Sequence, residues 1–586
     1  MTLTTDIRTT LLALSALSSG AVMAQNGTSS SAAVASINSP PHSSYIVGGS
    51  SVQNIQEGVA RVGGKLMRTL PIINSVTADL TDAQAEQLQS SGKFRLFKDR
   101  SVSTQGKQIA ALPTGIASVL TDGRAVTAKK NQYETNYPIL VGADVLQSQG
   151  ITGKGVTIAL LDTGLWINGP DKFDERVLAS VDLLNNGQPV SNDLYGHGTH
   201  ITSIAASGSV TKSGHYFGIA PDANLVIVRA FDGEGEGSYT NVIAGLNWIL
   251  ANQHTYNIRV INLSFGATPQ SNYWDDPLNQ AVMAAWKAGI VVVASAGNEG
   301  PTPMTIGVPG NVPYVITTGA QTDNFTPFNP TDDRLASFSS TGPTFEGFVK
   351  PEVIAPGGHM VGSMWYRSYL ANIDPGSMTK KESLFTMSGT SQAAAVTSGV
   401  VALMLQADPL LTPDTVKCRL LASASPAITS TGALAYSIFQ QGAGLINAAA
   451  AVNSTATGCA NQGLDITADL AGMAHFGGPA NQDASGSYYI MDMGGSAWAA
   501  PVAGDGYTWT KGYTWTKGYT WTKGYTWTRG YTWTKGYTWT KGHTWTKGYT
   551  WSKGYTWSQS LPWWGSTGIL NTGTAPASIE WWIPNE

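Results

Sequence analysis

Five near-continuous apolar runs between residues 155 and 320 constrain the fold of this chain most strongly. They read GVTIALLDTG, NLVIVRAFD, IRVINLSFG, GIVVVASAGN and VPYVITTGA. Segments with helical patterns lie between several of them, such as residues 240–254 and 277–289. Fully apolar strands that alternate with helices indicate a parallel sheet covered by helices on both faces. We therefore predict an α/β domain with a mostly parallel central sheet over residues 133–456, and we expect reactive groups at the carboxyl ends of its strands.

Three polar residues interrupt the apolar pattern of this domain at positions suited to catalysis. Asp162 ends the strand ALLDTG, His197 begins the helical run in YGHGTHITSIAA, and Ser391 begins another in MSGTS. Each has an ordinary structural interpretation, as a turn cap, a structural histidine or a helix cap. Together they are the residue types needed for attack by serine, proton transfer by histidine and orientation of the imidazole by a carboxylate.

The segment that follows Ser391 bears on whether this serine is a helix cap or a nucleophile. Residues 393–405 are apolar nearly all round, so we expect the helix to lie in the core. A hydroxyl at its start could cap unpaired backbone N–H groups. It could equally be a nucleophile, placed where those N–H groups and the helix dipole stabilise negative charge.

The motifs DTG, GHGTH and SGTS occur in the chain order Asp, His, Ser, and in this the chain resembles the subtilisin-like serine proteases. The similarity continues through GIAPDANLVIVRAFD, VINLSFG, ASAGNEG and GAGLINAAAAV, and it covers roughly residues 137–452. The resemblance implies a three-layer α/β/α fold. It also implies a serine endopeptidase that works through an acyl-enzyme and needs no cofactor for its chemistry.

The resemblance also implies roles for individual residues. Ser391 would be the nucleophile, His197 the general base and acid, and Asp162 the orienting carboxylate. The backbone N–H of Ser391 and the side-chain amide of Asn298 would form the oxyanion hole, whereas His200 would be structural.

Further matched positions imply the substrate-binding residues. These are Leu263, Ser264, Phe265 and Gly266 on one wall of the first specificity pocket, Ala296 and Gly297 on the opposite wall, and Gly307 near its floor. Glu299 at the rim is the one acidic residue among these segments. We therefore expect broad specificity with a preference for an apolar or aromatic residue before the cut.

The resemblance leaves the metal content open. The loop SGSVTKSGHYFGIAP lacks the asparagine-rich pattern of the family's strong calcium site. Asp171, Asp174 and Glu175 could contribute oxygen ligands, but acids in a solvated loop are the simpler interpretation. A structural calcium ion is possible and remains unassigned.

The N-terminal part of the chain indicates export and maturation. Residues 1–24 read as a signal peptide, with Arg8 before a short apolar run and small residues before a cut after Ala24. A linker (25–42) and a small α+β unit (43–104) follow. The unit resembles the family's inhibitory propeptide, and we expect autocleavage between about residues 103 and 136, in or next to a second linker (105–132).

The C-terminal part is unusual in composition. A Gly/Ala-rich linker region (457–505) leads to nine tandem hexapeptides of the form GYTWTK (506–559) and an aromatic end (560–586). Because a period of six is even, each repeat keeps its faces in a strand, which favours a strand, hairpin or β-solenoid over a helix, with a disordered tail as the alternative. Two readings of its role stay open, a spacer or an aromatic and cationic stripe that binds cell-envelope glycans or other polymers.

Charge and cysteine content complete the expectations. The chain carries a net charge of −4, which argues against a nucleic-acid binder. Residues 506–559 carry eight cations and no acid, so the remaining residues sum to −12. Cys418 and Cys459 are the two cysteines, and the sequence leaves open whether they form a disulfide. We expect a secreted monomer that acts on proteins or peptides and is inhibited by its own propeptide; the alternative is an adhesion protein with a vestigial protease domain.

Overall fold

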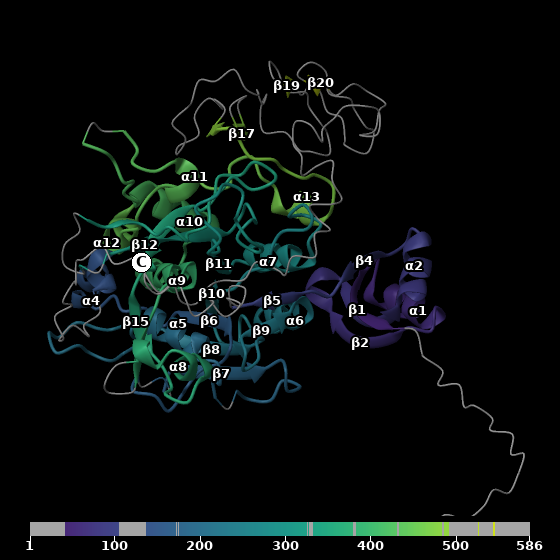
Figure 1. The fold of residues 1–586 in the computed structure, drawn as a ribbon, viewed down its shortest axis with the longest axis horizontal. Coiled ribbons are helices and arrows are strands. Elements are labelled where there is room, and N and C mark those ends of the chain that lie inside the picture. The colour runs from purple at the N-terminus through teal and green to yellow at the C-terminus, as the bar shows by residue number, and fades with distance from the viewer. Residues whose placement is uncertain are drawn as a thin grey trace, which may run out of the picture. The chain divides into compact units, whose positions relative to one another are not determined.

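The structure is a computed structural model that describes residues 41–104 and 136–490, together with the backbone of 525–526 and 543–544 (Figure 1). Within these ranges residues 172, 174, 191, 325, 327–331, 379–382, 431–432 and 483–485 are not described. The expected signal peptide, the linker at 105–132, nearly all of the hexapeptide repeats and the aromatic end lie outside the described residues.

A mixed, mostly parallel sheet forms the centre of the large domain (Figure 1). Its strands are β6 (Thr157–Asp162), β7 (Val177–Asp182), β8 (Asn224–Arg229), β10 (Ile258–Leu263), β11 (Val291–Ser295), β12 (Ile316–Thr322), β13 (Arg334–Leu335) and β14 (Val353–Pro356). They lie in the order β13-β12-β11-β10-β6-β8-β7, with β14 also paired to β12, and β13 alone is antiparallel to its neighbour in this sheet. The predicted α/β class with a mostly parallel sheet is confirmed.

Helices pack against this sheet in two groups. Helices α5 (His197–Ala206) and α9 (Thr390–Ala407) contact each other, and α9 also contacts β10, β11, β12 and β14. Helices α6 (Tyr239–Ala251) and α7 (Pro277–Lys287) contact each other, with α6 on β6 and α7 on β11. The other helices of this domain are α3 (Tyr137–Leu140), α4 (Ala143–Ser148), α8 (Tyr369–Ile373), α10 (Pro413–Ser423), α11 (Ile438–Gln441), α12 (Ala448–Asn453) and α13 (Ile466–Leu470).

The sequence explains where these helices lie and begin. Residues Thr390–Leu405 of α9 are all buried, as expected for a helix that is apolar nearly all round. The N-cap side chains Ser238 of α6, Asp276 of α7 and Thr412 of α10 each accept a hydrogen bond from a backbone N–H of the first turn.

A small α+β domain precedes the large one. It contains β1 (His42–Gly48), α1 (Val52–Arg61), β2 (Lys65–Leu70), a 3-10 turn η1 (Pro71–Ile73), β3 (Ser75–Thr81), α2 (Asp82–Ser90), β4 (Arg95–Lys98) and β5 (Ser101–Ser103). Strands β2, β3, β1 and β4 form an antiparallel sheet. Thr81 and Gln84 form a capping box at the start of α2, the position at which the sequence places a capped helix.

This small domain contacts the large domain through α6 and α7. Strand β2 and turn η1 pack against α6, and η1 also packs against α7. The Asn247 side chain accepts a hydrogen bond from the Ile72 backbone N–H at 3.0 Å, and the Thr77 and Thr240 hydroxyls are 3.1 Å apart.

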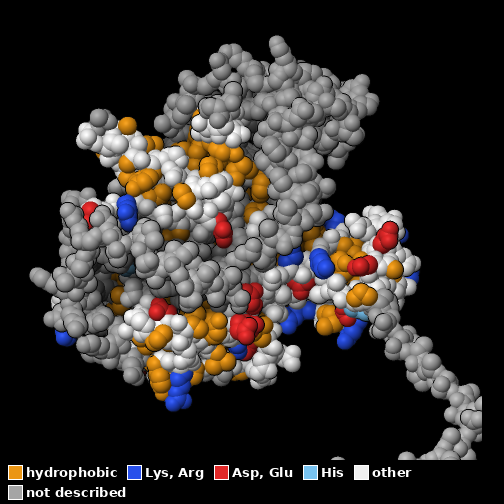
Figure 2. Space-filling model, viewed as in Figure 1, with side chains coloured by type: hydrophobic (Ala, Val, Ile, Leu, Met, Phe, Trp, Pro, Cys, Tyr) orange, Lys and Arg blue, Asp and Glu red, His pale blue; other side chains and the backbone are white. Residues whose placement is uncertain are grey.

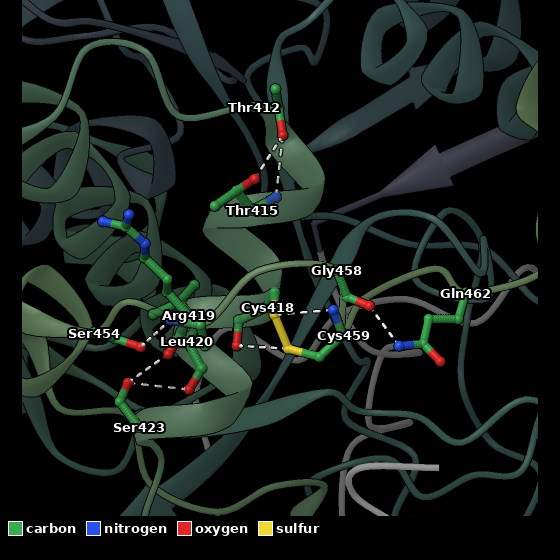
Figure 3. The surroundings of a disulfide bond; sticks show 11 residues. Thr412, Thr415, Cys418, Arg419, Leu420, Ser423, Ser454, Gly458, Cys459 and Gln462 are labelled. Carbon is green, nitrogen blue, oxygen red and sulfur yellow. Dashed lines mark hydrogen bonds between the residues drawn. A yellow bond between two sulfur atoms is a disulfide. The ribbon is translucent and has the colours of Figure 1, made fainter. Parts of the chain in front are cut away.

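Residues 459–490 are folded against the large domain, although the sequence interpretation assigned them to a linker region. Cys459 forms a disulfide with Cys418 of α10 (Figure 3). The buried Asp469 of α13 accepts hydrogen bonds from the hydroxyls of Tyr273 (2.6 Å) and Tyr314 (3.0 Å). Strands β17 (Ala480–Gln482) and β18 (Tyr488–Ile490) pair, and Ile490 packs with the buried Val349 and Phe439. The folded unit therefore continues beyond residue 456.

Two short strands fall within the hexapeptide repeats. β19 (Tyr525–Thr526) pairs in parallel with β20 (His543–Thr544), so that Tyr525 lies opposite His543. The offset of eighteen residues equals three hexapeptides, and equivalent positions of different repeats are thereby paired.

On the face drawn in Figure 2, Lys, Arg, Asp and Glu side chains are sparse among hydrophobic and neutral ones, in line with a charged fraction of 12%. None of the helices in the described ranges is long and apolar enough to cross a membrane.

Candidate active site

Three candidate catalytic residues come from elements that meet in the centre of the large domain. Asp162 is the last residue of β6, His197 is the first residue of α5, and Ser391 is the second residue of α9. Helix α5 packs against both β6 and α9. All three side chains are buried.

The histidine and the aspartate form a direct pair. His197 Nδ1 lies 2.7 Å from Asp162 Oδ1, and the same oxygen accepts a hydrogen bond from the Thr163 backbone N–H at 2.8 Å. Because an ionised carboxylate only accepts hydrogen bonds, Nδ1 carries the proton, and in a neutral imidazole Nε2 is then the basic nitrogen. His197 Nε2 has no hydrogen-bond partner among the described residues.

Ser391 lies at the start of a buried helix, as the sequence predicts. Its hydroxyl donates to the Ser264 carbonyl at 3.2 Å, and the Ser264 hydroxyl donates to the Ser391 carbonyl at 3.0 Å. In this structure the Ser391 hydroxyl therefore points toward Ser264, the residue that follows β10. Catalytic hydrogen bonds often form fully only when substrate is bound.

The Asn298 side chain is fixed by the residue before Ser391. Its Oδ1 accepts hydrogen bonds from both the backbone N–H and the hydroxyl of Thr390, each at 2.9 Å. Only the amide oxygen can accept these bonds, which orients Nδ2 as the donor side of the amide. Sequence reasoning did not identify this role of Thr390, although it lies within the SGTS motif.

His200 has the structural role that the resemblance implies. Its Nε2 lies 3.0 Å from the Phe385 carbonyl, and burial lowers the pKa of its imidazole to about 3. The side chain is therefore neutral at ordinary pH.

The structure shows local contacts for several of the residues expected to bind substrate. Gly266 forms an antiparallel bridge to Ser103 of the small domain. Gly307 donates its backbone N–H to the Ala296 carbonyl at 3.2 Å, and a Cβ on Gly307 would lie 3.2 Å from the Ala267 carbonyl oxygen. Leu263, Ser264, Phe265 and Ala296 are buried, and Gly297 has a φ of 106°.

The pairing of residues 101–104 with a second strand of the large domain was not anticipated from the sequence. Strand β9 (Glu236–Ser238) pairs antiparallel with β5, and the Thr104 N–H donates to the Gly235 carbonyl at 2.9 Å. Residues 101–104 therefore lie between β9 and Gly266 as an added strand. The only local signal was the glycine-rich stretch DGEGEGS between an apolar strand and a helix.

One interpretation of the acidic loop is wrong. Asp171, expected in a solvated loop, is buried and hydrogen-bonded to the Ser207 hydroxyl, and burial raises the pKa of its carboxyl group. Glu175 is exposed, and Asp174 is outside the described residues. Across the described ranges no group of three or more His, Cys, Asp or Glu side chains could hold a metal ion, and calcium stays unassigned.

Comparisons with known proteins identify a family and similar chains. The sequence profile of the Subtilase family matches residues 153–454. Serine protease AprX from Bacillus subtilis (strain 168) is 40% identical over 282 residues, which are 47% of this chain and 62% of AprX. Subtilisin DY from Bacillus licheniformis is 32% identical over 314 residues, which are 53% of this chain and 96% of that protein.

A solved structure supports the fold alone. It is fervidolysin from Fervidobacterium pennivorans, a keratinolytic enzyme related to subtilisin. The TM-score is 0.56 at 22% identity, over 71% of this chain and 62% of fervidolysin.

Proposed function

The chain belongs to the subtilase family of serine proteases, and on that premise we propose that it is a secreted, self-processing endopeptidase. One observation carries the proposal: a peptide strand of the chain itself, Ser101–Ser103, is paired with Gly266, two residues beyond the Ser264 carbonyl that accepts from Ser391. Extended peptides bind to sheet edges in this way, through main-chain hydrogen bonds.

The reaction would follow from the positions of the site residues. His197 Nε2 removes the proton of the Ser391 hydroxyl as the oxygen attacks the scissile carbonyl, and Asp162 stabilises the imidazolium that forms. His197 then passes this proton to the leaving amine. Water attacks the acyl-enzyme in the second half, with His197 again as the base.

The developing oxyanion would be stabilised by two donors. The Ser391 backbone N–H lies in the first turn of α9, ahead of the intrahelical hydrogen bonds, and the helix dipole adds to its effect. The second donor would be Asn298 Nδ2, whose amide Thr390 holds in position.

Asn298→Ala is expected to lower kcat by about 10²–10³-fold while the protein stays folded. The magnitude is the one established for loss of an oxyanion donor in subtilisin, a member of the same family. Steady-state kinetics with a small peptide substrate, beside a thermal melting curve, measures both. Wild-type kcat in this variant would remove Asn298 from the oxyanion hole.

The register of β5 predicts the processing site. Ser103 pairs with Gly266, and an antiparallel strand continued by two residues would bring residue 105 opposite Ser264, whose carbonyl accepts from Ser391. We therefore expect cleavage of the Gln105–Gly106 bond and a processed chain that begins at Gly106. Intact-mass measurement and N-terminal mapping of the purified protein test this. A mature N-terminus well beyond residue 110 would contradict the register.

The proposed specificity rests on the apolar surroundings of the first pocket. Phe265, Ala296 and Val308 are buried, and Glu299 is the acidic residue of the neighbouring segments. An apolar or aromatic residue before the cut is therefore favoured in protein substrates. An intramolecular cut after Gln105 is expected to depend less on this preference, because the preceding residues Ser101–Ser103 are already paired with the large domain.

Export is supported by the pattern of residues 1–24 and by the Cys418–Cys459 disulfide, since disulfides persist in oxidising compartments. The repeats would serve retention on cell envelopes or insoluble protein, by contacts of tryptophan rings and cations.

A further inference from the structure

The strand that crosses the proposed cleft begins at Arg100. The Tyr239 backbone N–H donates to the Arg100 carbonyl at 2.9 Å, one step before the pairing of Ser101 with Ser238. Arg100 thus continues the same antiparallel ladder as the residues that lead to the active site.

The Arg100 guanidinium is bound by two side chains of the large domain. Its Nη2 donates to the Tyr239 hydroxyl at 2.6 Å and to Asp276 Oδ2 at 2.9 Å. The guanidinium carbon also lies 4.6 Å from the centre of the Tyr239 ring. Stacking on a ring combined with hydrogen bonds to an acid is a geometry that arginine satisfies and lysine does not.

Tyr239 and Asp276 are held in position by contacts within the large domain. Asp276 Oδ1 caps α7 by accepting from the backbone N–H groups of Leu278 and Asn279. The Tyr239 hydroxyl lies 3.1 Å from Asp276 Oδ2. The capping bonds hold one carboxylate oxygen, so the other is presented to the guanidinium.

The Asp276 carboxylate is also buried. The side chain of Asp276 is 1% exposed, against 21% for that of Arg100. Burial raises the pKa of the Asp276 carboxyl group, and the charge of Arg100 opposes that rise. A buried carboxylate without a cation is unfavourable, so this position favours a cationic partner.

We propose that Tyr239 and Asp276 form an arginine-binding subsite of the substrate cleft, which Arg100 fills before processing. In the processed enzyme the subsite takes an arginine of a protein substrate, three residues before the residue that pairs with Gly266. The inference rests on the proposed endopeptidase function and adds a substrate class to it: extended segments with arginine six residues before the cut.

The test uses internally quenched peptides with the chain's own sequence KDRSVSTQGKQIA, carrying arginine, citrulline or alanine at the Arg100 position. Citrulline keeps the shape of arginine and removes its charge. The processed wild-type enzyme is expected to cleave the arginine peptide with a kcat/KM about tenfold higher than either other peptide, because charge-assisted hydrogen bonds are the strong ones.

Variants assign this preference to the two residues. In Asp276→Asn, which keeps a good N-cap, the ratio of kcat/KM for the arginine peptide to that for the alanine peptide should fall to about one. Tyr239→Phe keeps the ring and should give an intermediate ratio. The matched control Asp275→Asn removes the same charge one residue away and should keep the preference.

The outcomes separate the two proposals. Cleavage of all three peptides at equal rates by the wild-type enzyme overturns the arginine subsite and leaves the endopeptidase function standing. If casein is hydrolysed and none of the three peptides is cleaved, the subsite is overturned and the endopeptidase function stands. If neither casein nor any peptide is cleaved, the endopeptidase function is refuted and the subsite with it. If Asp276→Asn fails to fold, the citrulline comparison on the wild-type enzyme and the Tyr239→Phe variant still decide.

Discussion

Ser391→Ala is expected to abolish proteolysis and to leave the chain uncleaved between the small and large domains. The substitution removes the only proposed nucleophile and one hydrogen bond, to the Ser264 carbonyl, so the fold should persist. In subtilisin, of the same family, loss of the serine lowers kcat by about 10⁶-fold. Casein hydrolysis and the intact mass of the secreted chain measure the two effects.

A control on the same helix separates chemistry from packing. Ser398→Ala also removes a buried hydroxyl from α9, one that donates to Asn262 Oδ1 at 2.9 Å. It should lower stability by about 1 kcal/mol, retain processing and keep activity within a few-fold. Normal processing of purified Ser391→Ala, with no other protease present, would defeat the self-processing account.

A chain that ends at Gly458 is expected to lose most of its stability. It lacks Cys459, and loss of a native disulfide typically costs about 2–5 kcal/mol. It also lacks Asn461, which accepts a hydrogen bond from the buried Lys417 ammonium, and Asp469, which pairs with two buried tyrosine hydroxyls. Donors left without acceptors in the core add to the loss.

The comparison chain ends at residue 505. It keeps all the packed residues up to Ile490 and lacks only the repeats and the aromatic end, so it should melt at the full-length temperature and cleave small peptides at an unchanged rate. It should also bind cell envelopes or insoluble protein less than the full-length chain does. Equal melting temperatures for the chains ending at 458 and 505 would show that residues 459–490 are dispensable.

A truncated chain that keeps the folded unit is therefore expected to end beyond Ile490, within the region that the sequence pattern assigned to a linker. Residues 457–490 have no hydrophobic period, which is why the pattern suggested a linker. Their structure comes from single contacts, a disulfide and a buried aspartate, with partners 41 and about 155–196 residues away in sequence. Local periodicity contains no information on such partners.

In the candidate active site, too, some features were predictable from the sequence and others were not. Asp162, His197 and Ser391 were identifiable because each residue type ends a strand or begins a helix within a recognisable motif, and the His197–Asp162 pair fits that prediction. The role of Thr390 in holding Asn298 was not predictable, because it depends on the approach of the start of α9 to the loop after β11. The burial of Asp171 was missed for a similar reason: the sequence shows an acidic loop but not the Ser207 hydroxyl that packs on it.

The pairing of β5 with β9 and Gly266 was also beyond the sequence. The resemblance suggested an inhibitory propeptide, but the short segment RSVST carries no pattern that selects a partner strand. The register of residues 101–103 is defined by the two segments that pair with them, β9 and Gly266. From that register come both the predicted Gln105–Gly106 cut and the arginine subsite.

Labelling with a serine-directed fluorophosphonate, followed by peptide mapping, tests the central claim most directly. The account predicts one adduct, on Ser391, in the processed enzyme, with labelling lost in His197→Ala because the hydroxyl is no longer activated. A processed enzyme that hydrolyses casein and carries no adduct on Ser391, or carries it on another serine, would contradict the assignment of the nucleophile. A chain that neither labels nor hydrolyses casein would favour a binding protein with a vestigial protease domain.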